Sequence, residues 1–527
     1  MAIPIIDIFA GPGGLGEGFT SNYKRKKRIF DIKLSIEKDP EAHKTLELRS
    51  FIRKFPKNNL PLEYYDLIRE SDNNRREELR LKLYDLYVDQ AKAAKEEVWL
   101  AELGKPEFPP ELIDERITKA LNGKKDWLLI GGPPCQAYSL VGRSRVGGIN
   151  QKDHRVYLYK EYLRIIAKHH PAVFVMENVK GLLSAKVNGE KVFDWIKRDL
   201  QNPGSVFKGL DSHNYRIYSL STPSEDNDNN EHPKYKNDRN FLIQAEKYGV
   251  PQKRHRLILL GIREDFKNVP GILAPQKNEI SLKDVIGDLP KLRSGLGRTF
   301  KGYKSINGKI KRSYKKETDS DENWADTINE FKNEIISWNG FAKDYADTKI
   351  TPPPYGIGAE FIEYKTPSVH NPLADWYKDS QGFMGACNHI TRTHLIQDLK
   401  RYLFSSIFAD INNRFPRLAE FDKHSKNLLP DHKSAKTGKF ADRFRVQMMD
   451  QPATTITSHI SKDGHYFIHY DPMQCRSLTV REAARVQTFP DNYLFCGSRT
   501  AQYHQVGNAV PPYLAFQISN IVKKIFL

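Results

Sequence analysis

The sequence DIFAGPGGLG at residues 7–16 decides which fold we expect for this chain. It starts in a short apolar run typical of a strand, passes through closely spaced glycines and continues into a sequence typical of a helix. Glycines permit a tight turn and let the backbone approach a bound ligand closely. A strand, a glycine turn and a helix in this order are the first unit of a doubly wound α/β sheet.

The rest of the first 268 residues supports this class of fold. Apolar runs bounded by turn residues predict strands, and amphipathic stretches such as residues 157–169 predict helices. The predicted strands cover residues 5–10, 33–37, 127–130, 173–176 and 257–261. Strands that alternate with helices form a mostly parallel sheet covered on both faces. A Leu-, Lys-, Arg- and Glu-rich insertion at about residues 50–112 interrupts this pattern, and we interpret it as a helical structural elaboration.

Residues 269–475 have a different character, with many Gly, Pro, Asn and Lys residues and weak periodicity. We expect a second, smaller domain of mixed structure there, with a basic loop at residues 295–316 and a helix at residues 393–408. The last segment, residues 476–527, is helical again. We expect it to return to the first domain, which comprises residues 1–268.

The composition limits the class of protein. A chain of 527 residues with 39% hydrophobic and 28% charged residues is long enough for two globular domains. Its formal net charge of +18 favours a polyanionic partner, with solubility alone as the alternative explanation. The cysteines at positions 135, 387, 475 and 496 are too few for a disulfide scaffold. Without a signal peptide or an apolar run of membrane-spanning length, we expect a cytoplasmic protein with no membrane partner.

The second predicted strand ends in a carboxylate. Glu37 ends this strand, where it could accept hydrogen bonds from both ribose hydroxyls of a nucleoside. Together with Gly11, Gly13 and Gly16, this carboxylate fits a dinucleotide as well as S-adenosylmethionine. A plain structural turn is a third interpretation, so these residues alone leave the ligand open.

Reactive side chains follow the later strands. Cys135 lies in the run GGPPCQ, just after a buried strand and on a loop made rigid by two prolines. A lone cysteine is usually a buried structural residue, but the polar, basic sequence that follows favours a presented thiol. Glu177 ends the next strand, and Arg254 and Arg256 alternate onto one side of the strand after it. A cap, a salt bridge and a solvated basic edge are the ordinary alternatives for these three residues.

These elements, in this order, resemble the DNA cytosine-5 methyltransferase family. The matching motifs are residues 7–16, Glu37, Pro134-Cys135, Asp153-x-Arg155-x-x-Leu158, Glu177-Asn178-Val179, Gln252-x-Arg254-x-Arg256, Arg481-Glu482-Ala483-Ala484-Arg485-Val486-Gln487-Thr488-Phe489-Pro490 and Gln505-Val506-Gly507-Asn508-Ala509-Val510-Pro511-Pro512. The resemblance covers both ends of the chain. It implies a Rossmann-like methyltransferase fold in which residues 269–475 form the target-recognition domain.

The resemblance also implies a reaction and its catalytic residues. Carbon 5 of cytosine is a poor nucleophile, so Cys135 would add to carbon 6 and activate the base. Glu177 would protonate or hydrogen-bond ring nitrogen 3, Arg256 would contact the carbonyl oxygen and Arg254 would support that site. The target base would be flipped out of the duplex to reach these groups.

S-adenosylmethionine is the cofactor that the resemblance implies. Phe9, Glu37 and Leu158 would surround its adenosine, and Asn508 and the glycine turn would line the methionine side. Asp114 is our candidate for the acidic residue that meets the adenine amino group, because of its distance from Cys135 in the sequence. The predicted cofactor residues are Phe9, Ala10, Gly11, Gly13, Gly14, Leu15, Glu37, Asp114, Pro133, Leu158, Asn508 and Val510.

Double-stranded DNA is the implied substrate. A loop at residues 139–150 would close over the flipped nucleotide, and basic stretches after residue 295 suit phosphate contacts, although each is individually more typical of a solvated loop. The predicted DNA-binding residues are Gln136, Ser139, Arg143, Arg145, Arg298, Lys301 and Lys304. His389 and His394 could suggest a metal, but no third ligand is evident, so we expect structural histidines and no metal site.

Two alternative functions come from the same resemblance. An RNA cytosine-5 methyltransferase would share the catalytic core, but that branch resembles a minimal version without a large middle domain. A non-catalytic DNA-binding regulator would have lost catalytic residues, whereas Cys135, Glu177, Arg254 and Arg256 are all present. An NAD-dependent enzyme explains neither Pro134-Cys135 nor the C-terminal motifs. We therefore expect a monomeric modification enzyme of a restriction-modification or phage DNA-protection system. A cognate restriction endonuclease or a defence system is its candidate partner, and the sequence does not decide whether one is present.

Overall fold

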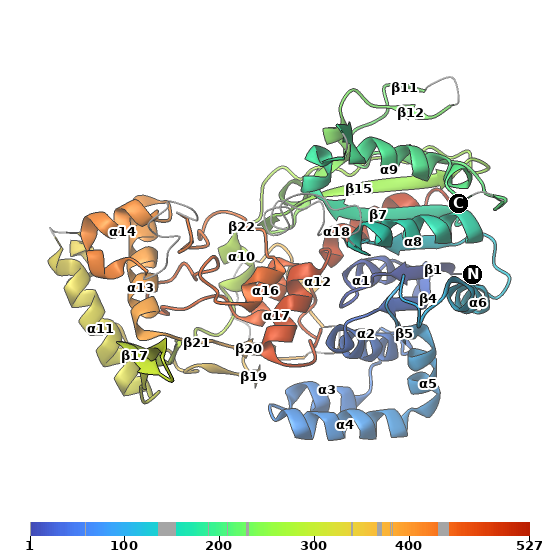
Figure 1. Ribbon diagram of the computed structural model, residues 1–527. Coiled ribbons are helices and arrows are strands. Elements are labelled where there is room, and N and C mark those ends of the chain that lie inside the picture. Colours follow the sequence, from blue (N-terminus) through green and yellow to red (C-terminus); the bar gives the residue numbers. More distant parts are fainter. Residues whose placement is uncertain are drawn as a thin grey trace.

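The computed structural model describes residues 2–526 except residues 58, 135–153, 188, 208, 228–230, 339–340, 366–370, 380, 382 and 431–441. Figure 1 shows two lobes joined side by side. The first lobe is built around a large sheet and carries both ends of the chain. Most of the chain between residues 280 and 508 forms the second lobe, and the last helix, α18, Pro512–Val522, lies in the first lobe again.

A mixed sheet forms the centre of the first lobe. In spatial order its strands are β5, Val98–Leu100; β4, Phe30–Glu37; β1, Ile3–Ile8; β6, Leu128–Gly131; β7, Val173–Val179; β15, His255–Arg263; and β10, Tyr215–Tyr218, with β13, Leu242–Gln244, also paired to β15. Strands β5 to β7 run parallel, whereas β15 is antiparallel to β7, β10 and β13. The chain order reverses between β1 and β6, which places the ligand crevice of a doubly wound sheet at the carboxyl ends of these two strands. The predicted fold class is confirmed.

Helices cover both faces of the sheet, because alternate strand residues point to opposite sides. Ile6 and Ile8 of β1 pack on one face and Ile5 packs on the other. The first face is covered by α6, Pro110–Leu121, α8, His154–His169, and α9, Val192–Gln201; the second is covered by α1, Gly14–Thr20, and α18. Short surface hairpins pair β2, Tyr23–Lys24, with β3, Lys27–Arg28; β8, Lys186–Val187, with β9, Glu190–Lys191; and β11, Asp226–Asn227, with β12, Pro233–Lys234.

The insertion predicted at residues 50–112 is only partly an insertion. It contains β5, the edge strand of the main sheet, which is too short to show a period in the sequence. The helices before β5 are α2, Pro40–Arg53; α3, Leu62–Arg69; α4, Asn73–Leu86; and α5, Val88–Glu97. Their apolar residues form a cluster with Cys387 and Leu494 of the second lobe, and the Tyr64 hydroxyl donates to the Asn492 carbonyl oxygen at 2.6 Å. The helices therefore tie the two lobes together.

The second lobe has two apolar clusters. The cluster nearer the sheet joins residues of α10, Leu282–Ile286, α12, Ala374–Tyr377, α16, Val480–Val486, and α17, Arg499–Asn508; the cluster farther from it joins α11, Asp321–Ser337, α13, Ile396–Asn412, and α14, Leu418–His424. Short pairings link β14, Gln252–Lys253, to β22, Ala453–Thr454; β16, Gly295–Leu296, to β21, Thr393–His394; and β19, Gly358–Ile362, to β20, Ala386–Ile390. We expected the chain to return to the first lobe at residue 476. In the structure α16 and α17 still belong to the second lobe, and of the helices after residue 476 α18 packs on the sheet.

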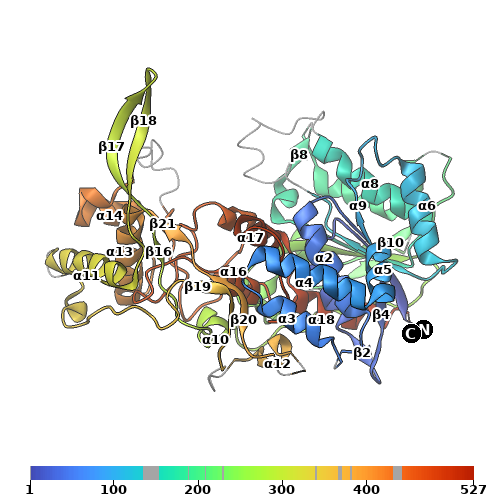
Figure 2. The ribbon, with the colours of Figure 1, turned by 90° about the horizontal axis from the view of Figure 1, so that it is seen from below.

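The basic loop expected at residues 295–316 is instead a β-hairpin. Strands β17, Arg298–Ile306, and β18, Lys309–Lys316, pair antiparallel and protrude from the second lobe, as Figure 2 shows. The turn at Asn307 and Gly308 has positive φ at both residues, which is the geometry of a tight two-residue hairpin. The abundance of lysine masked the strand pattern in the sequence.

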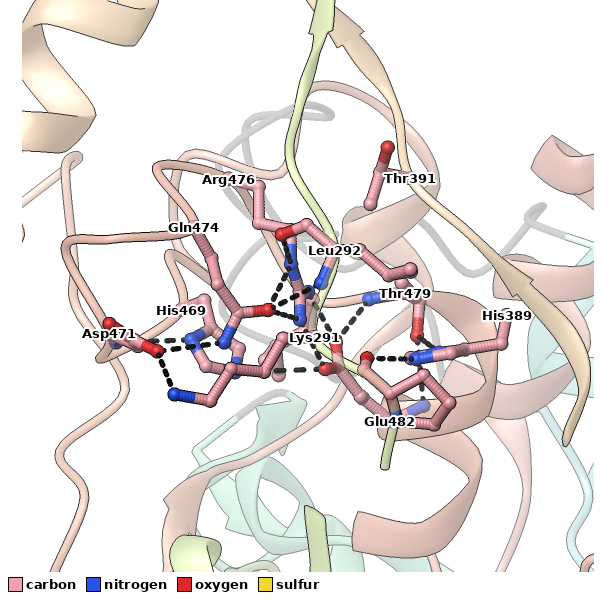
Figure 3. Close-up of polar contacts among 12 residues, drawn as sticks. Lys291, Leu292, His389, Thr391, His469, Asp471, Gln474, Arg476, Thr479 and Glu482 are labelled. Carbon is pink, nitrogen blue, oxygen red and sulfur yellow. Dashed lines mark hydrogen bonds and ion pairs between the residues drawn. The ribbon is translucent and has the colours of Figure 1, made fainter. Parts of the chain in front are cut away.

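A buried polar network fixes the core of the second lobe (Figure 3). Arg476 donates two hydrogen bonds of 2.7 Å to the Glu482 carboxylate, which also accepts from the Thr479 backbone N–H. Burial would raise the pKa of Glu482, but the Arg476 guanidinium holds it below its usual range. Burial lowers the pKa of the adjacent His469 to about 3, so this imidazole is neutral. A charged pair that is fully hydrogen-bonded in this way fixes the geometry of α16.

Candidate active site and cofactor pocket

A cavity of about 480 Å³ opens at the carboxyl ends of the parallel strands. Its walls come from the loops after β1, β4, β5, β6 and β7, from the start of β15 and from the end of α17. Segments from both ends of the sequence therefore meet in one pocket. Of the predicted cofactor residues, those that line it are Phe9, Ala10, Gly11, Gly14, Leu15, Glu37, Pro133, Leu158, Asn508 and Val510.

The glycine turn packs closely against the last motif of the chain. Gly13 has a φ of 94°, in the left-handed region, and caps α1, although it does not itself line the cavity. A side chain at Gly14 would collide with the Val510 carbonyl oxygen, so the last motif packs directly on this turn. Phe9, with a φ of 57°, also adopts a strained backbone conformation, a feature common at ligand sites.

Glu37 holds the glycine turn and still faces the cavity. One carboxylate oxygen accepts the Gly11 backbone N–H at 2.7 Å, and the other accepts that of Asp39 at 2.8 Å. Burial raises the pKa of Glu37, and these backbone hydrogen bonds oppose the shift. A carboxylate has room for about four hydrogen bonds, so Glu37 retains acceptor positions toward the cavity.

The prediction for Asp114 is wrong. Asp114 lies on α6, outside the lining of the cavity, and its carboxylate binds Arg164 at 2.7 Å and His169 at 2.9 Å on α8. The edge of the cavity is formed by the segment after β5, which includes Glu102. Distance along the sequence misplaced this position, because β5 and the loop after it were not recognised.

Glu177 and Arg256 form an ion pair inside the cavity. The Arg256 Nε lies 2.8 Å from a Glu177 carboxylate oxygen, and each side chain is less than a fifth exposed. Their strands β7 and β15 are paired, which fixes this geometry. A Cβ added to Gly132 would lie 2.9 Å from the other Glu177 oxygen, so the loop after β6 touches the carboxylate. This loop continues through Pro134, which also lines the cavity.

Arg254 lines the same cavity as the ion pair. Its guanidinium donates to the Ile456 carbonyl oxygen at 2.8 Å, and its Nε has no hydrogen-bond partner among the described residues. Burial and then the neighbouring Arg256 lower the pKa of Arg254 well below its ordinary value, while Glu177 raises it. An arginine held in this way by backbone carbonyls keeps positive potential at the back of the pocket.

Several predicted site residues fall outside the described part of the chain. They are Cys135, Gln136, Ser139, Arg143 and Arg145. The cavity also has walls that sequence reasoning missed, among them Thr457 and Ser458 before and within the turn η7, Ser458–Ser461, and His504 of α17. The motif around Asn508 was recognisable and could have led to His504, whereas no pattern distinguishes Thr457.

The other predicted residues lie in the second lobe. Arg298, Lys301 and Lys304 belong to the protruding hairpin. His389 contacts the Thr479 hydroxyl and the Pro290 carbonyl oxygen, both at 2.9 Å, so both ring nitrogens have partners. No group of three or more His, Cys, Asp or Glu residues that could hold a metal occurs in the described part of the chain. Nor does any described helix have the length and apolar character needed to cross a membrane.

The sheet order and the glycine turn define a Rossmann-like fold, and the comparisons with known proteins identify it as that of a methyltransferase. One solved structure, a prophage-encoded protein of E. coli assigned as a DNA modification methyltransferase, has this fold with a TM-score of 0.50 and 18% identity, over 100% of this chain and 99% of that one. M.Bpa9945I, a type II methyltransferase of Bacillus paralicheniformis, is 33% identical over 99% of this chain and 98% of its own length.

The name of a more distant relative states which base and which carbon atom it methylates. M.ApeKI, a DNA (cytosine-5-)-methyltransferase of Aeropyrum pernix, is 25% identical over 77% of this chain and 82% of its own. The pattern of the C-5 cytosine-specific DNA methylases matches residues 107–524. The chain belongs to this family, and its activity is the methylation of carbon 5 of cytosine in DNA.

Proposed function

We propose that the enzyme methylates a flipped-out cytosine of duplex DNA through a covalent Cys135 adduct, with S-adenosylmethionine as methyl donor. The observation that carries the proposal is the single cavity shared by the glycine turn, Glu37 and the Glu177–Arg256 pair. Pro133 and Pro134 line the same cavity, and Cys135 is the next residue of the chain. Cofactor groups and catalytic groups are therefore neighbours.

The residues that line the cavity support S-adenosylmethionine as its ligand. A Cβ added to Gly11 would meet no atom within 4 Å, so the space beside the turn is open to a ligand. Glu37 would accept the ribose hydroxyls, Leu158 and Phe9 would pack on the adenine, and Asn508 would bind the methionine end. When bound, S-adenosylmethionine supplies an electrophilic methyl group.

The protein's own residues would then activate the base. The Cys135 thiolate adds to carbon 6, which forms the carbon–sulfur bond and moves the ring electrons toward nitrogen 3. Glu177 donates a proton or a hydrogen bond to that nitrogen, so addition gives an enamine that is nucleophilic at carbon 5. Arg256 positions Glu177 and contacts the cytosine oxygen, with Arg254 behind it. Carbon 5 would then take up the methyl group that bound S-adenosylmethionine supplies, and would lose its proton. Expulsion of the Cys135 thiolate restores the aromatic ring.

The second lobe would hold the DNA around the target base. Arg298, Lys301 and Lys304 would contact phosphates, because they lie on an exposed, protruding hairpin. Gln136, Ser139, Arg143 and Arg145 follow the nucleophile in the sequence and would contact the flipped nucleotide. We propose a monomeric modification enzyme that works in the cytoplasm at the nucleoid, as the DNA-protecting partner of a restriction endonuclease.

Tritiated S-adenosylmethionine with separate DNA and RNA pools tests this function. We expect label in DNA, and Cys135→Ser should remove it without weakening DNA binding. Label found in RNA alone would contradict the proposed substrate, and full activity of the variant would contradict the proposed nucleophile.

A pair of carboxylates tests the cofactor site. Glu37→Gln should weaken S-adenosylmethionine binding about tenfold or more, because it weakens a charge-assisted hydrogen bond to ribose. Asp114→Asn is the matched control and should leave the affinity unchanged, since this residue lies on α6 away from the cavity. Calorimetric titration with the cofactor measures both, and equal effects of the two changes would contradict the assignment.

A further inference from the structure

A second cavity, of about 410 Å³, lies in the second lobe at the base of the β17–β18 hairpin. The hairpin contributes Phe300, Arg312 and Tyr314 to its wall. His394 of β21, Asp398 near the start of α13, and His465 also line it. Aromatic faces and hydrogen-bonding groups of both signs thus surround one concave space, which is the composition of a small-molecule or base pocket.

The two faces of the hairpin differ in chemistry. Phe300 pairs with Tyr314, and Tyr303 pairs with Arg312, on the face that borders the cavity. The Phe300 ring lies 5.4 Å from that of Tyr303 and 5.7 Å from that of Tyr314, measured between centroids. On the opposite face Lys304 stands directly across from Lys311. Like charges placed directly opposite destabilise a hairpin, which indicates a polyanionic partner for this face.

The wall of the cavity is held in place before any ligand arrives. Gln397 accepts the Phe300 backbone N–H at 3.2 Å and donates to its carbonyl oxygen at 3.3 Å, which anchors the hairpin to α13. His465 shares a 2.8 Å hydrogen bond with the Tyr402 hydroxyl. Burial lowers the pKa of His465 and of His394, so both imidazoles are neutral and able to donate and accept.

The second cavity is close to the catalytic one. Thr457 and Ser458 line the catalytic cavity, whereas Lys462 and His465 line the second, and only the short turn η7 separates them. A 3₁₀ turn rises about 2 Å per residue, so the two walls lie roughly 8 Å apart along the turn. Bases of one DNA strand are spaced about 3.4 Å apart, so the walls on either side of η7 are separated by a distance of a few bases.

We propose that this second cavity binds a nucleobase of the recognised sequence, next to the flipped cytosine, and so contributes to sequence specificity. The proposal rests on the proposed function, because it places the target cytosine in the catalytic cavity. Phe300 and Tyr314 stack on the unstacked base, and Arg312, Asp398 and the two imidazoles read its edge. The lysine face of the hairpin holds the flanking phosphates.

Selection from a pool of duplexes with randomised sequence tests the cavity by binding alone. The variants are Arg312→Gln, at an exposed position, and Phe300→Leu, which keeps apolar bulk but removes the ring. Lys311→Ala on the opposite face is the matched control. We expect both cavity variants to weaken the preference at one base pair about tenfold or more. The control should weaken binding uniformly over all sequences and lower the salt slope by about 1.

Duplexes of the selected sequence with 2-aminopurine at one position at a time test whether the base leaves the stack. With the unmodified enzyme, one position other than the target cytosine should brighten, and Phe300→Leu should abolish the signal while Lys311→Ala retains it. The proposal is overturned if no such position brightens, or if both cavity variants lose affinity uniformly with an unchanged sequence preference, as phosphate contacts would require. Bisulfite sequencing reads methylation separately, so failure of the proposed function would show there and not in the bound sequences.

Discussion

The helices α3 to α5 and the hairpin β17–β18 both extend from the rest of the molecule, but they handle their side chains in opposite ways. The helices bury Tyr64, Tyr65 and Tyr84 in a cluster that includes residues of the second lobe, and the Tyr65 hydroxyl bonds Asp379 at 3.0 Å. The hairpin instead protrudes from the second lobe and places Lys304 opposite Lys311 (Figure 2). The aromatic rings of the first element are packed within the fold, whereas the second element places two like charges directly opposite each other.

We infer from this difference that the helices α3 to α5 stabilise the fold, whereas the hairpin β17–β18 serves binding. A segment whose aromatic groups are buried and hydrogen-bonded contributes to the free energy of unfolding. A segment in which like charges face each other across two strands contributes little to stability or lowers it. Such charges can gain favourable interactions when they contact phosphates. Composition alone does not separate them, because both segments are rich in lysine or arginine.

The largest effect should come from the core of the helical insertion. Phe51→Ala removes a fully buried ring that packs against Tyr84 at 4.9 Å between centroids. We expect the free energy of unfolding to fall by about 3–5 kcal/mol, the usual cost of a large cavity. Chemical denaturation measures this change. The salt dependence of DNA binding should stay the same, and a changed salt slope would show that the helices contact DNA.

Reversing two charges on the hairpin should act on binding. Lys304→Glu with Lys311→Glu should lower DNA affinity on the order of 100-fold, because two phosphate contacts are lost and repulsion replaces them. Lys82→Glu with Lys92→Glu makes the same change in net charge on exposed positions of the insertion and is the control. Fluorescence anisotropy with a labelled duplex compares them. Equal losses for both pairs would mean that net charge, and not the hairpin, governs binding.

A separate effect concerns pH and a buried carboxyl behind the glycine turn. Asp7 is 1% exposed, and neither of its oxygens has a hydrogen-bond partner among the described residues. Burial raises the pKa of Asp7 to about 8, against a nearby Arg53 that lowers it. The folded protein therefore retains a proton that the unfolded chain releases. Stability should decrease as pH rises from about 4 to about 8, by about 1.4 kcal/mol per pH unit from this group.

Asp7→Asn tests this pH dependence, because the amide has nearly the shape of the protonated carboxyl. Denaturation at several pH values should show a flatter profile for the variant than for the unmodified enzyme. Asp31→Asn on the neighbouring strand β4 is the control, since its side chain is 39% exposed and pairs with Lys33. Parallel profiles for Asp7→Asn and the unmodified enzyme would show that Asp7 is ionised in the fold. The hairpin lysines should not contribute to this slope.

The first lobe could be predicted from sequence because its motifs lie where strands end. Parallel strands bring their carboxyl ends together, so Glu37, Glu177 and the turn at Gly11 had to meet once the strands were recognised. The prediction for Asp114 was wrong because the short strand β5 before it was not recognised. Its position was then inferred from distance along the chain, which does not fix distance in space.

The second lobe could not be predicted in this way. The sequence of the hairpin contains one recognisable turn signal, Asn307-Gly308. Lysines occupy positions on both strands, however, and obscure the alternation of apolar and polar residues that is typical of a half-buried strand. The second cavity joins residues of β18, α13 and the segment after η7, which are far apart in the sequence. Only long-range packing brings them together, and no local pattern records it.

Bisulfite sequencing of DNA from cells that express the enzyme tests the central claim most directly. We predict protected cytosines at one short recurring sequence with the unmodified enzyme, and none with Cys135→Ser. The Glu177–Arg256 pair and the cofactor pocket are intact in that variant, so the loss would be specific to the nucleophile. Protected cytosines that persist in Cys135→Ser, or no protected cytosine with the unmodified enzyme, would contradict the account.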